Sequence, residues 1–148
     1  MQDKPDTDVF MRSLARFMRE TAMTKLSGHA AFEARVAFNV LEIMRREQTW
    51  GARFAAAQRA RLAALLGEDG TLLALNQALC RRIRAGEISL RDPNLRIHLR
   101  KAAMGKLAID QPSYASYRRA QKQGWSEEDG YEAAGAPDGS ATPGKTGA

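Results

Sequence analysis

Residues that build catalytic centres are scarce in this sequence, which holds one cysteine, Cys80, and two histidines, His29 and His98. A single cysteine excludes an intramolecular disulfide and is typical of a reducing compartment. The two histidines are far apart, neither has partners at the spacing of metal ligands, and no histidine stands near Cys80. Paired carboxylates on one helical face are absent as well. The residues therefore predict no catalytic, metal or cofactor site, and we expect a protein that is not an enzyme.

Long apolar runs are also missing, so we expect no membrane-spanning segment. The first residues, MQDKPDTD, are polar and acidic, which predicts no secretory signal and a cytoplasmic protein. No stretch alternates with period two, so we expect no strands. Aromatic residues make up only 7% of the chain and rarely stand among the basic ones, which disfavours a nucleic-acid-binding surface.

One motif near the C-terminus matches a nucleotide-binding pattern. Residues 139–146 read GSATPGKT and fit G-x-x-x-x-G-K-[ST], the phosphate-binding loop. That loop needs a strand before it and a helix after it, whereas no aliphatic run precedes Gly139 and two residues follow Thr146. We interpret the match as a chance occurrence in a flexible, Gly- and Pro-rich tail over 123–148.

Apolar residues at helical spacing extend through residues 1–122, which we expect to form one helical domain. A first helix, capped by Asp6 or Thr7, ends before Ser27. Helices are then predicted over about 29–48, 52–66, 72–85, 93–109 and 112–122, with Gly67, Gly86 and Pro93 among the start and stop signals. The predicted fold is all-α: a compact bundle of five or six helices with a disordered C-terminal tail.

The net charge of +6 is unevenly distributed. Residues 1–120 hold 21 basic against 12 acidic residues, whereas residues 121–148 hold 2 against 5. Such a basic domain attracts nucleic acid, an acidic protein face or a phosphate-bearing small molecule.

Three polar residues interrupt the apolar helical faces. Asn76 stands among Leu72, Leu75, Leu79 and Ile83, and Asn39 lies beside Phe32 and Ile43. Lys106 lies on a face that we expect to consist of Leu95, Leu99, Ala102 and Ile109. Buried polar groups need partners, so these residues either bond within the bundle or belong to a mixed surface that a partner covers.

Three strings together resemble a known family: FEARVAFNVLEIMRRE (32–47), LNQALCRRIRAGE (75–87) and KLAIDQPSYASY (106–117). The sequence over residues 2–120 is similar to small, all-helical bacterial proteins with a domain of unknown function. Members accompany an aminoglycoside-phosphotransferase-like kinase and an acyl-CoA dehydrogenase. The resemblance implies a non-catalytic accessory subunit of that kinase, which acts on hydroxyacyl-CoA in hydroxy-acid and fatty-acid catabolism and would itself bind ATP and Mg²⁺.

The expected partner is therefore the kinase in a heteromeric complex, with acyl-CoA as a candidate ligand. The candidate interface residues combine the polar residues above with residues of the matching strings and the neighbouring arginines: Arg35, Asn39, Asn76, Arg82, Arg84, Lys106, Asp110 and Tyr114. Two alternatives remain open, a basic nucleic-acid-associated helical protein and a small CoA-ester binding protein or enzyme.

Overall fold

The protein folds entirely into helices over residues 6–126, the part of the chain that the computed structural model describes. The predicted all-α fold is confirmed. The GSATPGKT motif lies outside the described residues, as does most of the predicted tail.

The first part of the chain forms one continuous rod built from three labelled elements: α1 (Thr7–Phe17), the π-helical turn η1 (Met18–Ala22) and the short α2 (Met23–Lys25). The side chain of Asp6 caps α1 by accepting from the N–H of Asp8 at 3.4 Å. The chain then turns at Ser27 and runs back along this rod as α3.

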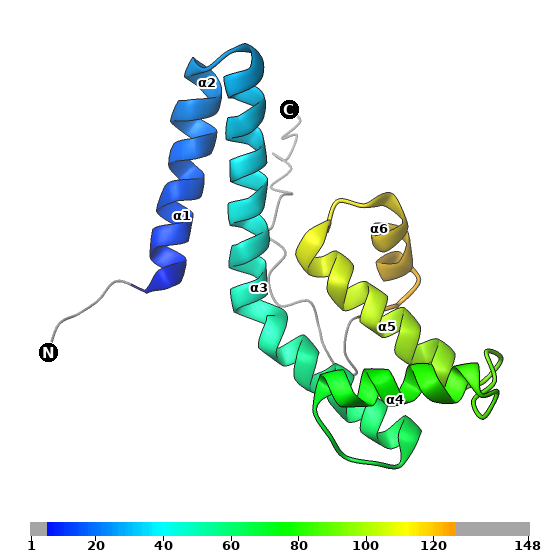
Figure 1. Ribbon diagram of the computed structural model, residues 1–148. Coiled ribbons are helices and arrows are strands. Elements are labelled where there is room, and N and C mark those ends of the chain that lie inside the picture. The colour runs from blue at the N-terminus through cyan, green and yellow to red at the C-terminus, as the bar shows by residue number, and fades with distance from the viewer. Residues whose placement is uncertain (1–5, 127–148) are drawn as a thin grey trace, which may run out of the picture.

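Helix α3 (Gly28–Leu66) is a single helix of 39 residues, so the predicted break between 48 and 52 is wrong. Thr49 and Gly51 lie between the two predicted helices, but neither residue removes a backbone hydrogen bond. The hydroxyl of Thr49 donates to the carbonyl oxygen of Arg45 at 2.9 Å, and one interior glycine costs only about 1 kcal/mol. The helix spans about 58 Å and bends below its midpoint (Figure 1).

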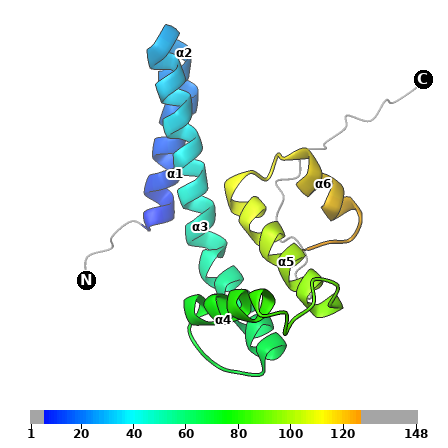
Figure 2. The same ribbon diagram turned by 45° about the vertical axis from the view of Figure 1, so that its right-hand side comes forward.

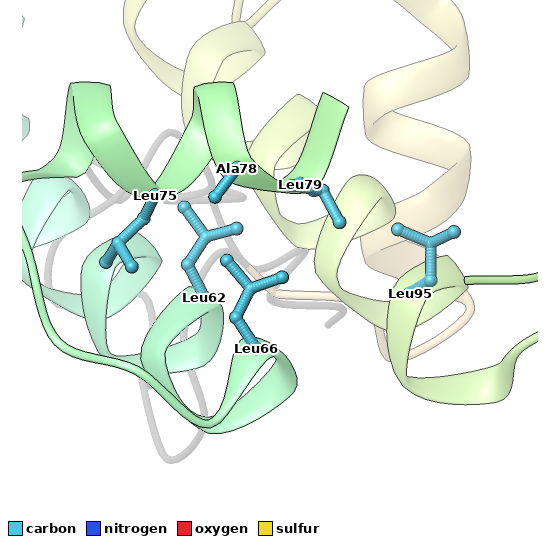
Figure 3. Close-up of a cluster of buried hydrophobic side chains, with 6 residues drawn as sticks. All are labelled: Leu62, Leu66, Leu75, Ala78, Leu79 and Leu95. Atoms are coloured by element: carbon cyan, nitrogen blue, oxygen red, sulfur yellow. The ribbon is translucent and has the colours of Figure 1, made fainter. Parts of the chain in front are cut away.

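Helices α4 (Leu72–Arg84) and α5 (Pro93–Asp110) pack on the C-terminal half of α3, and α6 (Ala115–Lys122) packs on α5. Caps predicted from the sequence start two of them. The Thr71 hydroxyl accepts from the N–H of Ala74, and the Asp92 carboxylate accepts from the N–H of Leu95. Five leucines and one alanine from α3, α4 and α5 then meet in the main core, shown in Figure 3: Leu62, Leu66, Leu75, Ala78, Leu79 and Leu95.

Two arginines hold the turn between α3 and α4. The helix ends at Gly67, whose φ of 70° is a conformation that favours glycine. Nη1 of Arg82 donates to the carbonyl oxygen of Leu66 at 2.8 Å, and Nε of Arg59 donates to that of Gly70 at 2.7 Å. The bond from Arg82 satisfies the carbonyl group of Leu66, which has no partner within α3 at the end of that helix. Together the two bonds fix α4 against α3.

The buried face of α5 differs from the predicted one, because Leu99 and Lys106 are exposed. The buried residues are Leu95, His98, Lys101, Met104, Gly105, Ala108 and Ile109. Packing against other helices decides the face: Leu95 joins the core of α3 and α4, and Gly105 lies against Phe54 of α3, where an added Cβ would make an ordinary contact at 3.5 Å.

A second, smaller core lies between α5 and α6. Met104, Ala108 and Tyr117 are buried in it, and Phe54 of α3 and Trp125 pack against them. The guanidinium of Arg100 lies 4.1 Å from the centre of the Trp125 ring. Trp125 was predicted to belong to the tail, but its indole packs on the helical domain.

The N-terminal rod and the first half of α3 form a hairpin that stands apart from this bundle. Among the described residues, α1, η1 and α2 contact only each other and α3. In both views the hairpin extends away from α4, α5 and α6 (Figures 1 and 2). Within α1, only Met11 and Ala15 are buried.

Candidate functional site

Two of the eight residues predicted for an interface bond within their own domain. Nδ2 of Asn76 donates to the carbonyl oxygen of Leu72 one turn earlier, at 2.8 Å. Arg82 bonds to Leu66 as described, and its Nη2 lies 3.6 Å from the Glu68 carboxylate. Each of these polar side chains therefore has a structural partner inside the fold.

The other six predicted residues have exposed side chains: Arg35, Asn39, Arg84, Lys106, Asp110 and Tyr114. The structure brings three of them to one place, where α3 passes the end of α5. Lys106 and Asp110 line a hollow of about 490 Å³ together with Ile43 of α3, and Asn39 stands one helical turn before Ile43. Arg84 ends α4, on a different element.

A mixed surface extends from this hollow along α3. We use "mixed surface" for Phe32, Val36, Asn39, Ile43, Lys106 and Asp110. The α3 members recur at intervals of three and four residues, so they share one side of the helix. Phe32 is 58% exposed and Val36 is 45% exposed. The α1-facing side of α3 carries Ala34 instead.

Arg46 fixes the geometry of the mixed surface. Its Nε donates to the carbonyl oxygen of Ile109 at 2.6 Å, which ties α3 to the last turn of α5. Nη1 lies 3.8 Å from the Glu42 carboxylate. Burial lowers the pKa of Arg46, and the charge of Glu42 opposes that shift. The bond holds Asn39 and Ile43 in register with Lys106 and Asp110.

A cleft of about 500 Å³ lies between α3 and α5, next to the mixed surface. Two basic residues, Arg61 and Lys101, line the cleft. Phe54 and two glycines, Gly51 and Gly105, line it as well. Lys101 is buried, because its apolar stem follows the buried face of α5. Its burial was not predicted from the sequence. Burial, and then the nearby charge of Arg61, lower the pKa of Lys101.

His98 is buried on the same side of α5. Its Nδ1 has no hydrogen-bond partner within residues 6–126. Burial lowers the pKa of His98 below its ordinary value of 6.5, and the positive charge of Arg61 lowers it further. The folded protein therefore favours a neutral imidazole at this position.

This neutral imidazole makes stability depend on pH. Above pH 6.5 the side chain is neutral in both states, whereas below pH 6.5 the unfolded chain binds a proton before the folded chain does. We expect His98 to lower the free energy of unfolding as the pH falls from 6.5, by at most about 1.4 kcal/mol per pH unit.

Urea unfolding at several pH values measures this contribution. The decrease in the free energy of unfolding below pH 6.5 that His98 causes should disappear in His98→Gln. It should persist in His29→Gln, because His29 is 82% exposed and pairs with Glu33. Equal pH profiles for the wild type and His98→Gln would contradict a buried neutral imidazole.

Several apolar side chains that the sequence placed on helical packing faces are exposed on the hairpin. They are Phe10, Leu14, Phe17, Phe32, Val36, Val40 and Met44. Periodicity places these residues on apolar faces, but it does not reveal whether another helix packs on them, and no helix within residues 6–126 covers them. Large apolar surfaces of this kind mark interaction sites.

No helix within residues 6–126 is sufficiently long and apolar to cross a membrane. No group of three or more His, Cys, Asp or Glu residues is arranged there to hold a metal ion.

The structure thus defines an all-helical protein with exposed, partly apolar surfaces on a projecting hairpin. A family model described as a domain of unknown function, DUF6285, matches residues 24–114, which is more than half of the chain. The chain belongs to the DUF6285 family. No curated protein and no solved structure matches it.

Proposed function

We propose that this protein is a cytoplasmic, non-catalytic accessory subunit that binds and supports an aminoglycoside-phosphotransferase-like kinase. The kinase acts on hydroxyacyl-CoA in hydroxy-acid and fatty-acid catabolism and supplies the site for ATP and Mg²⁺. The identity of this partner rests on the resemblance of residues 32–47, 75–87 and 106–117 described above.

The observation that carries the binding role is the mixed surface. Phe32 and Val36 expose about half of their apolar side chains, and Asn39 follows Val36 by three residues. Lys106 and Asp110, both exposed, line the hollow at Ile43 further along α3. Interfaces between separate proteins have this composition, with apolar side chains that are covered on binding and polar groups that fix the register. The hydrogen bond from Arg46 to Ile109 holds together α3 and α5, the two helices that carry the mixed surface.

The test is co-purification of the tagged full-length protein from its native host, followed by identification of the proteins that elute with it. We expect an aminoglycoside-phosphotransferase-like kinase in the eluate, in a stable ratio to the tagged chain. Recovery of nucleic acid without such a kinase would refute the proposal and support a basic nucleic-acid-associated protein instead.

A further inference from the structure

A second surface on the hairpin has a different composition from the mixed surface. Phe17 and Leu26 lie beside a hollow of about 580 Å³ between the N-terminal rod and α3, whose α3 side is formed mainly by Ala30, Ala34 and Ala37. Leu14 and Phe10 precede Phe17 by three and seven residues, so they continue its ridge along α1. Val40 and Met44 continue the ridge that follows Ala37 on α3.

We call this surface the hairpin face and define it by its exposed side chains: Phe10, Leu14, Phe17, Leu26, Val40 and Met44. The opposite edge of the hairpin is basic. A separate hollow between α1 and α3 is lined there by Arg12, Arg16, Arg19 and Arg45, together with Val9 and Glu42. The hairpin is therefore amphipathic as a unit, with one apolar side and one charged side.

The apolar area is sufficient for a dimer. Its six large side chains are about half exposed, and a large apolar side chain presents roughly 150–200 Å² in full. Together they offer on the order of 500 Å². A standard interface covers about 800 Å² of each partner, of which about 65% is apolar in homodimers, or roughly 500 Å².

The hairpin face is also complementary to itself. Its α1 ridge carries bulky side chains such as Phe10 and Phe17, whereas its α3 ridge is small where Ala30 and Ala37 lie. A two-fold axis along the hairpin lays each α1 over α3 of the second copy, so Phe17, ten residues before Ser27, meets Ala37, ten residues after it, twice. Lys25 and Glu33, which both line the hollow, then face each other across the axis with opposite charges.

We propose that the hairpin face binds a second copy of this chain, so that two hairpins form a symmetric four-helix bundle. This dimer leaves Phe32, Asn39 and the α5 residues of the mixed surface outside the bundle, whereas Val36, one turn before Val40, stands at its edge. It would also explain why a two-helix hairpin with few buried side chains projects from the domain: the apolar residues that hold it in place come from both copies.

Sedimentation equilibrium of the purified full-length protein tests this dimer, with three variants. Leu14→Glu and Val40→Glu place a charge on the hairpin face. Val9→Glu is the matched control, because Val9 and Leu14 are 50% and 49% exposed on the same helix but Val9 lies at the basic edge. Circular dichroism of each variant confirms that it remains helical.

We expect the wild type and Val9→Glu to sediment at about 33 kDa, twice the 16.3 kDa of the chain. The dissociation constant should rise roughly 30-fold or more in Leu14→Glu and in Val40→Glu. The melting temperature of the wild type should also rise with protein concentration, as it does when folding and association are linked. A monomeric wild type would overturn the proposal and would indicate that the hairpin face binds a different protein. A dimer that tolerates both charges, or that Val9→Glu disrupts equally, would overturn it too.

Discussion

Replacing Leu62 by alanine is expected to destabilise the protein by about 3–4 kcal/mol, the largest effect of any single truncation that we predict. Leu62 is fully buried at the place where α3, α4 and α5 meet, packed among Leu75, Leu79 and Leu95 (Figure 3). The truncation removes apolar contacts and leaves a cavity that the leucines of α4 and α5 cannot fill. Because domains of this size are stable by only about 5–15 kcal/mol, a substantial share of the total is lost.

Chemical unfolding followed by circular dichroism measures this loss. Leu73→Ala is the matched control: the same substitution on α4, at a side chain that is 69% exposed, should change the free energy of unfolding by less than about 0.5 kcal/mol. Similar effects of the two substitutions would show that α3, α4 and α5 do not share the core described above.

Phe32→Glu is expected to weaken association with the kinase by roughly 30-fold or more, while the fold and the dimer remain intact. Phe32 is the largest apolar side chain of the mixed surface and is more than half exposed, so a glutamate there costs the isolated chain little. In a complex the same carboxylate would be taken out of water without a partner, which is costly.

Titration of the purified kinase with each variant, followed by calorimetry, gives the dissociation constants. Val9→Glu serves as the control here as well, because it adds the same charge to the hairpin at a distance from the mixed surface. Unchanged affinity in Phe32→Glu would move the kinase contact to another part of the chain. Loss of binding in Val9→Glu to the same extent would indicate a general charge effect instead.

Much of the fold could be predicted because local rules decide it. The caps at Asp6, Thr71 and Asp92 and the stop at Gly67 are fixed by neighbouring backbone groups, and the structure confirms them. The continuity of α3 could not be predicted in the same way, since the packing of α1 and α5 along its length outweighs a weak local signal at Gly51.

The site was predicted less completely, because exposure depends on contacts between distant segments. Asn39 and Lys106 stood out as polar residues among apolar neighbours, and both are exposed at the joint of α3 and α5. Asn76 gave the same signal but bonds to its own helix. The buried Lys101 and His98 gave none, because the buried face of α5 depends on how that helix packs against α3 and α6.

The central claim, that this chain supports a kinase, is tested most directly by the rate of phosphoryl transfer to a hydroxyacyl-CoA. The rate is measured with the purified kinase alone, with the wild-type chain and with Phe32→Glu. We predict a rate that increases and saturates as wild-type chain is added, and that increases only at much higher concentrations of Phe32→Glu. A rate that stays unchanged at every concentration of wild-type chain would contradict the account.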